Sequence, residues 1–213
     1  FAIDPNTGEV TVAGNIDYES QDGHKIEVTA TSDDGSTSTQ EFKINVNDQD
    51  EFDVSAITDT DTSANTVAEN VSVGTSVGIT AFASDADGSN NGITYSLSDD
   101  AGGLFAIDPN TGEVTVAGSI DYESATNHNI EVTATSDDGS TSTQTFAINV
   151  DNINEAPTDI AFTSSGNIGD GLVAGTVTAT DPDAGDTIAY SLTDDSSGTF
   201  SIDTNTGEIS WNG

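Results

Sequence analysis

The chain has 213 residues, of which 38 are Asp or Glu and only two are Lys or Arg, so its formal net charge at pH 7 is -36. Such a surface repels nucleic acid and anionic lipid headgroups, because both are bound through basic side chains. A compact chain with this charge also repels itself, so the composition favours either a disordered chain or a folded chain that binds cations at defined places.

Hydrophobic patterning favours the folded alternative. Apolar and polar residues alternate in stretches such as residues 130–135, IEVTAT, which is the period of a half-buried strand. The sequence has no cysteine, so a secreted chain of this kind needs another stabiliser, and a metal is the usual one. No apolar run approaches the length of a membrane span.

Internal repetition defines the domain organisation. Residues 1–14 recur unchanged at 105–118, residues 27–40 recur unchanged at 131–144, and residues 200–209 form a third, diverged copy of the segment that begins at Phe105. A repeat of about 100 residues has the size of an immunoglobulin-like sandwich. We therefore predict an all-β chain of tandem Greek-key β-sandwiches.

In chain order, the prediction divides the sequence into half a repeat, a complete repeat and another half. Residues 1–50 carry roughly the last four strands of a sandwich, and residues 156–213 carry roughly the first five. Residues 51–155 form the complete repeat. Its predicted strands lie at 54–60 with 66–68, 77–83, 92–98, 104–107, 113–117, 129–136 and 141–150.

Acidic residues gather at positions that the repeats share. Alternating carboxylates such as Asp85 and Asp87, or Asp121 and Glu123, can converge on one hard cation from a loop or bulge. Calcium takes six to eight such oxygen ligands and tolerates irregular geometry, whereas magnesium demands a stricter octahedron. Calcium is therefore the favoured cation.

These motifs and their order resemble the cadherin domain. The family carries a Glu on its first strand, a DxD, a DRE-like motif, an AxD-like site and a DxNDN linker. The matching residues here are Glu69, Asp85 and Asp87 with Asn91, residues 121–123, Asp137, and the junctions at 48–51 and 152–155. The near-identical copies look like the cadherin-like repeats of large bacterial secreted adhesins.

Three positions depart from the family pattern. Asn152 stands where the first Asp of the second junction is expected, with Asp151 beside it. Ser136 occupies the AxD position, so Asp137 or Asp138 must substitute for the missing Asp. The third copy offers Asp170 where a Glu is expected.

The resemblance implies calcium ions at both junctions. Ligands at the first junction are expected to be Asp17, Glu19, Asp48, Asp50, Glu51, Asp85, Asp87, Asn91 and Asp137. Ligands at the second are expected to be Glu69, Asp121, Glu123, Asn152, Asn154, Glu155, Asp181, Asp183 and Asp186. Calcium bound there would stiffen a joint that is otherwise a hinge.

The expected function is structural. We predict a calcium-rigidified extracellular rod, adhesin extender or fibre subunit; a calcium-dependent carbohydrate- or protein-binding module is the alternative. Paired carboxylates also occur in glycosidases, but here they recur in every copy and sit at junctions. His24 and His128 precede the same strand in two copies, and no Ser or Cys nucleophile motif lies near either, so an enzyme is disfavoured.

Neighbouring repeats of the same protein are the expected partners. The sequence begins and ends inside a repeat, without a signal peptide, as an internal fragment does. Two explanations stay open: the halves of successive molecules complement each other head-to-tail into a filament, or the fragment was excised from a longer array.

Overall fold

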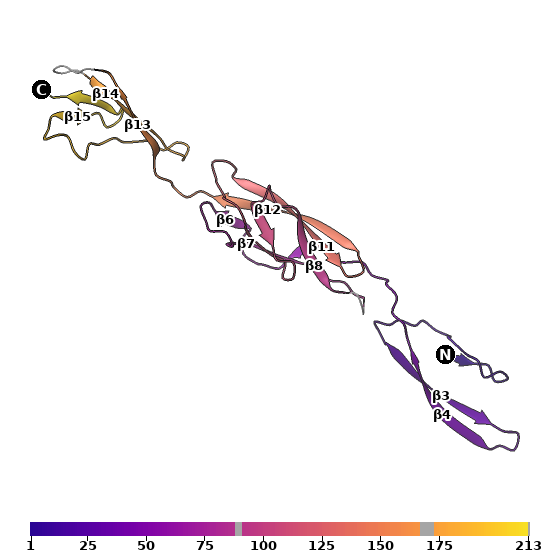
Figure 1. Cartoon of the computed structure of the whole chain (residues 1–213). Coiled ribbons are helices and arrows are strands. Elements are labelled where there is room, and N and C mark those ends of the chain that lie inside the picture. The colour runs from indigo at the N-terminus through magenta and orange to yellow at the C-terminus, as the bar shows by residue number, and fades with distance from the viewer. Residues whose placement is uncertain (88–90, 167–172, 213) are drawn as a thin grey trace. The chain divides into compact units, whose positions relative to one another are not determined.

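The computed structural model describes residues 1–87, 91–166 and 173–212 (Figure 1). These residues form strands, and no helix among them is long and apolar enough to span a membrane. The strands before the complete repeat are β1 (Ala2–Ile3), β2 (Val10–Thr11), β3 (Gly23–Thr31) and β4 (Thr37–Asn45). Those after it are β13 (Thr158–Ser164), β14 (Val173–Thr180), β15 (Phe200–Ile202) and β16 (Glu208–Trp211).

The described part of the complete repeat contains eight strands in two four-stranded sheets. They are β5 (Thr58–Asp59), β6 (Thr66–Ala68), β7 (Ser76–Phe82), β8 (Ile93–Asp99), β9 (Phe105–Ile107), β10 (Glu113–Val116), β11 (Asn127–Ser136) and β12 (Thr141–Asp151). One sheet has the order β5-β7-β10-β9 and the other β6-β12-β11-β8, so the chain changes sheet repeatedly. The predicted all-β sandwich is confirmed.

Contacts divide the chain into two units. The first comprises residues 1–66, 72–118 and 129–148, and the second comprises residues 67–71, 119–128 and 149–213. Within the first unit, β3 and β4 also form a separate antiparallel ribbon. Within the second unit, β13-β14-β16-β15 form a four-stranded sheet.

The core of the first unit follows from the alternation of apolar residues. On β7, Val77, Ile79 and Ala81 are at most 1% exposed, and on β11 Val132 and Ala134 are fully buried. Residues two apart in a strand share one face, so each strand turns an apolar face inward and its polar residues outward. The sheets bury these faces against each other, which is the main stabilising term of a sandwich.

One turn recurs in all three copies. The Asp108 carboxylate accepts hydrogen bonds from the backbone N–H groups of Asn110 (2.8 Å) and Thr111 (2.9 Å), and the same bonds form at Asp4 and Asp203. Gly112 ends the turn with a positive φ of 73°. Its C=O accepts from Ala81 N at 2.9 Å, so the turn holds β10 against β7.

A tyrosine occupies matching places in the second and third copies. Tyr95 Oη accepts from Ala83 N at 2.9 Å, and Tyr190 Oη accepts from Ala179 N at 3.1 Å. Tyr95 lies on β8, which pairs with β11, but the stretch around Tyr190 is not a strand among the described residues. The described part of residues 156–213 therefore holds four strands where roughly five were predicted, because residues 173–212 supply no counterpart of β11 with which the stretch around Tyr190 could pair.

Gly112→Ala is expected to lower the thermal unfolding midpoint of the complete repeat. A Cβ at this position would lie 2.1 Å from the Ala81 carbonyl oxygen, and φ is already in the left-handed region. The expected loss is roughly 2–3 kcal/mol, from backbone strain and overpacking together. Gly139→Ala is the matched control, because its φ is +98° but nothing lies within 4 Å of its added Cβ. Equal losses in the two variants would contradict the close approach to Ala81.

Candidate metal centre

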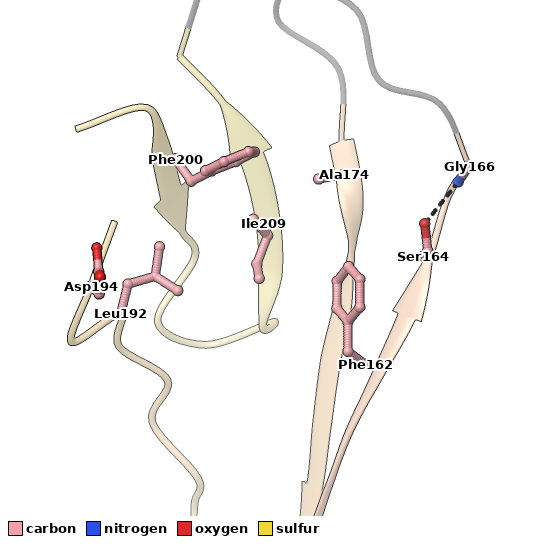
Figure 2. Close-up of a pocket in the computed structure, with 8 residues that line it drawn as sticks. All are labelled: Phe162, Ser164, Gly166, Ala174, Leu192, Asp194, Phe200 and Ile209. Atoms are coloured by element: carbon pink, nitrogen blue, oxygen red, sulfur yellow. Dashed lines mark hydrogen bonds between the residues drawn. The ribbon is translucent and has the colours of Figure 1, made fainter. Parts of the chain in front are cut away.

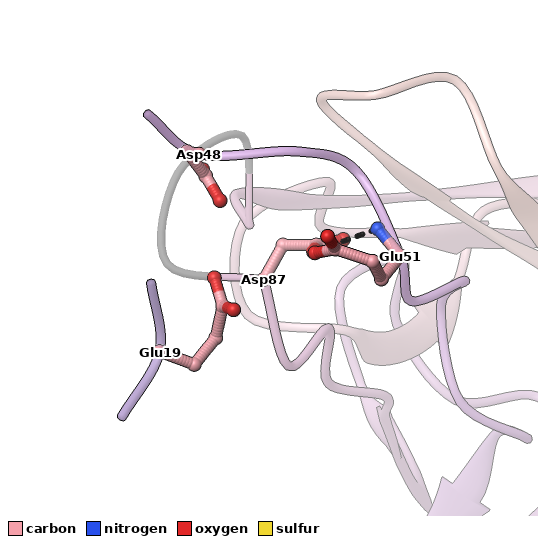
Figure 3. Close-up of side chains that lie close together, drawn as sticks. All are labelled: Glu19, Asp48, Glu51 and Asp87. Atoms are coloured by element: carbon pink, nitrogen blue, oxygen red, sulfur yellow. Dashed lines mark hydrogen bonds between the residues drawn. The ribbon is translucent and has the colours of Figure 1, made fainter. Parts of the chain in front are cut away.

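Four carboxylates meet at the first junction. One oxygen each from Glu19, Asp48, Glu51 and Asp87 lies within 4.8 Å of the others (Figure 3). Glu19 comes from the loop between β2 and β3, Asp48 and Glu51 from the segment after β4, and Asp87 from the loop after β7. Segments distant in the sequence therefore deliver acidic oxygens to one point.

Asp87 is the fixed member of this group. It is only 3% exposed, and its carboxylate accepts hydrogen bonds from the N–H groups of Glu51 (3.2 Å) and Phe52 (3.3 Å). It also belongs to a second group, in which its oxygen lies within 4.8 Å of oxygens of Asp50 and Asp138. Asp87 thus joins the linker after β4, which contains Glu51 and Phe52, to the loops of the complete repeat.

The second junction repeats this arrangement with different residues. Oxygens of Glu69, Glu123 and Glu155 lie within 4.8 Å of one another. Glu69 is 3% exposed and accepts hydrogen bonds from Ile153 N (2.7 Å) and Tyr122 N (2.9 Å). Two backbone amides thus fix this carboxylate beside the linker.

A further acidic group lies after β14. Asp181, Asp183 and Asp186 bring oxygens within 4.8 Å of one another. Asp183, 8% exposed, accepts a hydrogen bond from Glu155 N at 2.8 Å, just as Asp87 accepts from Glu51 N. The two linkers are therefore bound to the following repeat in the same way.

Several predicted ligands lie outside these groups. Asp17 and Asp121 each cap their own turn, through bonds from the N–H and hydroxyl of Ser20 and Ser124 respectively. Asp85 accepts a bond from Asp87 N at 3.1 Å. The side-chain amide of Asn154 donates a hydrogen bond to Glu155 O. That Asn91 and Asn152 are calcium ligands stays a prediction.

Asp138, not Asp137, reaches the first junction. A Cβ on Gly92 would lie 2.4 Å from the Asp137 carboxylate, so that side chain lies beside Gly92, just before β8. Because Ser136 occupies the AxD position, the sequence indicates only that Asp137 or Asp138 can substitute for the missing ligand. Asn70 was not predicted; its side-chain amide donates to Glu155 Oε1. Asp170 lies outside the described residues.

The electrostatics set the junction carboxylates apart from the turn carboxylates. Desolvation raises the pKa of Glu155 and Glu123, and the charge of Glu69 raises both further. Desolvation likewise raises the pKa of Asp50 and Glu51, with Asp138 and Glu19 as the strongest like-charged neighbours. In contrast, the Ser124 hydroxyl lowers the pKa of Asp121.

The donor set fits a hard divalent cation. The chain has only two basic residues, Lys25 and Lys43, both on the β3–β4 ribbon, and Lys25 pairs with Glu41 at 2.8 Å. Asp138 Oδ2 and Glu155 Oε2 are enclosed, yet neither meets a hydrogen-bond donor within the described ranges. Enclosed carboxylate oxygens without donors are what oxygen-seeking cations coordinate.

Comparison with known proteins gives matches to one family. Residues 1–47 and 63–151 match the model of the family described as "Cadherin domain". The chain is 38% identical to human Protocadherin Fat 1 over 161 residues, which is 73% of the chain but 3% of that protein. It is 33% identical to Cadherin-related family member 1 of Xenopus laevis over 226 residues, or 98% of the chain and 26% of that protein.

Solved structures share the fold. The protocadherin gammaB7 EC3-6 cis-dimer structure matches with a TM-score of 0.66 and 22% identity, covering 100% of this chain and 55% of that one. Human CDH23 EC21-23 matches with a TM-score of 0.61 and 24% identity, covering 100% and 71%. These matches are to tandem cadherin repeats.

The raised and lowered pKa values predict opposite pH effects in the metal-free chain. Junction acids with a raised pKa are disfavoured as anions, so stability should rise as pH falls from 7 toward the ordinary glutamate value of 4.5. Asp17 and Asp121 have a lowered pKa, so below their ordinary value of 3.8 stability should fall again. Urea unfolding in EDTA at successive pH values measures this maximum. A steady loss of stability from pH 7 downward would contradict it.

Proposed function

Because the chain belongs to the cadherin domain family, we propose that it is a calcium-rigidified tandem repeat that serves as a structural rod, adhesin extender or fibre subunit outside the cell. The observation that carries this proposal is the pair of linkers at which carboxylates from separate segments of the described chain converge. The role is structural rather than catalytic.

Calcium would be held by the groups already described. At the first junction the proposed ligands are Glu19, Asp48, Asp50, Glu51, Asp87 and Asp138. Asp85, which accepts a hydrogen bond from Asp87 N, is a further proposed ligand. At the second they are Glu69, Glu123, Glu155, Asp181, Asp183 and Asp186. A bound calcium ion supplies positive charge and takes up the free oxygen lone pairs, which removes the repulsion at each linker.

Linker stiffness would follow from where the ligands lie. Glu51 belongs to the linker, Asp87 to a loop of the complete repeat and Glu19 to a loop before β3. A cation bound by all three resists bending at the linker, because bending would separate its ligands. Without the cation, the like charges favour separation instead.

An extracellular setting suits this chemistry. Extracellular calcium modules commonly bind with dissociation constants of about 10⁻⁴–10⁻³ M, so they fill only where calcium is abundant. The near-identity of residues 1–14 and 105–118 favours a spacer, because copies of a spacer need not diverge in function. A bacterial secreted adhesin or surface fibre is the kind of protein that we propose it comes from.

Calcium is expected to raise the thermal unfolding midpoint, and EDTA to lower it. A ligand that binds only the folded state adds about 2.7 kcal/mol at a free concentration of 100 times its dissociation constant. Calorimetric titration with calcium chloride measures the affinity directly. Identical melting curves with calcium and with EDTA would refute the proposal.

The substitution Glu155→Gln should separate the effect of the Glu155 charge from the effect of its packing. Gln keeps the size and the carbonyl that accepts from Asn70, but it removes one of the converging charges. We expect calcium affinity at the second junction to fall by roughly tenfold or more, while the metal-free midpoint stays equal or rises because repulsion is relieved. Glu113→Gln, on the exposed face of β10, is the matched control and should change neither value. A lower metal-free midpoint in Glu155→Gln would mean that the carboxylate has a purely structural role.

A further inference from the structure

One asparagine–glycine pair lies beside the first junction. Asn91 and Gly92 are both exposed, and they belong to the irregular segment that leads into β8. In the sequence, glycine follows only two asparagines, Asn91 and Asn212. Asparagine is a thermally labile residue, and a glycine after it increases the lability, because glycine adopts conformations that bring its backbone nitrogen to the side-chain carbonyl carbon. The side-chain amide of Asn91 is therefore open to chemical loss.

The backbone nitrogen of Gly92 is available for this reaction. Among the residues that the structure describes, the Gly92 N–H donates to no acceptor. The Gly92 C=O, in contrast, accepts a hydrogen bond from Asp137 N at 2.9 Å. The residue is thus anchored on its carbonyl side, and no hydrogen bond holds its nitrogen away from the Asn91 side chain.

The packing around Gly92 explains why a glycine follows this asparagine. A Cβ at position 92 would lie 2.4 Å from the carboxylate of Asp137. Any larger residue would have to displace that carboxylate, which stands next in sequence to Asp138 of the first acidic group. The labile pair is therefore linked to the construction of the junction.

The second and third copies share one register beyond this position. Leu192 and Phe200 line a hollow of the third copy (Figure 2), as Leu97 and Phe105 line a hollow of the second. The spacing of the two residues is the same in both copies. Counting back from them, the residue of the third copy that corresponds to Asn91 is an aspartate, Asp186.

This aspartate belongs to an acidic group. Oxygens of Asp181, Asp183 and Asp186 lie within 4.8 Å of one another, and Asp186 N donates to Asp183 O at 3.3 Å. The two copies also build the preceding DxD pair alike, because the bond from the second Asp N–H to the first Asp carboxylate measures 3.1 Å in each. The third copy therefore carries a carboxylate where the second carries the labile amide of Asn91.

We propose that Asn91 is a site of spontaneous deamidation, which gives the loop before β8 the third carboxylate that the loop after β14 already has in Asp186. The modification is a property of the chain itself. Its consequence for calcium rests on the function proposed above.

The reaction consumes only water. Gly92 N attacks Asn91 Cγ, a new C–N bond closes a succinimide ring, and the Cγ–Nδ2 bond breaks. The proton of the Gly92 N–H leaves with the departing amide as ammonia. Water then opens the ring at Cγ to give aspartate, or at the main-chain carbonyl carbon to give isoaspartate. Both residues are exposed, so water reaches the ring from solvent.

Either product adds a negative charge at the first junction. In the metal-free chain this charge increases the repulsion with Asp137 and with the neighbouring acidic group. With calcium present, an added carboxylate strengthens binding, because affinity at oxygen sites rises with the number of charged ligands. Since the lost ammonia does not return, the linker would change in one direction as the molecule ages.

Mass spectrometry of the aged chain tests the site. The chain is incubated in EDTA at mildly alkaline pH and then digested with chymotrypsin, which releases residues 83–95 by cleavage after Phe82 and Tyr95. Deamidation replaces NH₂ by OH and raises the mass at Asn91, whereas isomerisation of an aspartate leaves the mass unchanged. Tandem spectra then assign the gain to one residue.

Asn110 is the matched control in the same digest. It is exposed like Asn91, but the next residue is Thr111, whose N–H donates to the Asp108 carboxylate at 2.9 Å. Asn91 is expected to lose its amide several-fold faster than Asn110. Equal rates, or an Asn91 that keeps its amide, would overturn the proposal whether or not the linkers bind calcium.

Variants test the consequence. Asn91→Asp supplies the aspartate product at once, and it should lower the unfolding midpoint in EDTA and tighten calcium binding by roughly tenfold. Asn91→Gln lacks the labile pair, so its midpoint should not drift on ageing as that of the unmodified chain does. Gln144→Glu makes the same exchange of amide for carboxylate within β12, away from the linkers, and should leave the affinity unchanged.

The results separate the two proposals. Unchanged calcium affinity in Asn91→Asp, with calcium still bound by the chain, would overturn the consequence assigned to the deamidation. No calcium binding by any variant would refute the proposed function, while the loss of the Asn91 amide in EDTA would still establish the modification site. Circular dichroism checks that each variant keeps its strands.

Discussion

Repulsion between carboxylates at the two linkers is the constraint on which this molecule depends. The chain carries 38 acidic residues, and the structure brings several of them together where one repeat ends and the next begins. Backbone amides hold Asp87 and Glu69 in place, so the acidic groups are built into the fold rather than collected by chance on a mobile surface. Under the proposed function, a cation bound at these groups would couple its binding free energy to the folding of the linkers.

Repetition also shows how far context decides the fate of a residue. Residues 27–31 of β3 and 131–135 of β11 have the same sequence, but among the described residues only β11 belongs to a four-stranded sheet that faces another. The sequence specifies an extended, alternating strand in both places, whereas burial requires a facing sheet. The local sequence pattern and the presence of a facing sheet thus contribute separately to burial, and the copies within one chain allow the two contributions to be compared.

The sequence predicted much of this structure, for identifiable reasons. Alternation and the repeat period predicted the strands, and the order of the acidic motifs predicted which segments would meet. The choice between Asp137 and Asp138 could not be predicted, because it depends on which side chain the turn after β11 directs toward Gly92. The hydrogen bond from the Ser124 hydroxyl to Asp121 could not be predicted either, since the same carboxylate can accept bonds within a turn or bind a cation. The stretch around Tyr190 alternates as a strand does, but among the described residues it pairs with no strand, because pairing is not encoded locally.

The sequence that residues 27–31 of β3 share with residues 131–135 of β11 has a consequence for how the chain reaches its native state. While the chain folds, either segment can pair with β8, and the two solutions have the same side-chain chemistry. Loop closure favours β11, since the chain from Asp99 to Asn127 is roughly half as long as that from Thr31 to Ile93, but a doubling of loop length costs only about 0.6 kcal/mol. The strand sequences themselves therefore favour pairing of β11 with β8 over pairing of β3 with β8 only slightly. The preference for β11 as the partner of β8 must come from the residues that differ at the linkers and from the order in which segments leave the ribosome.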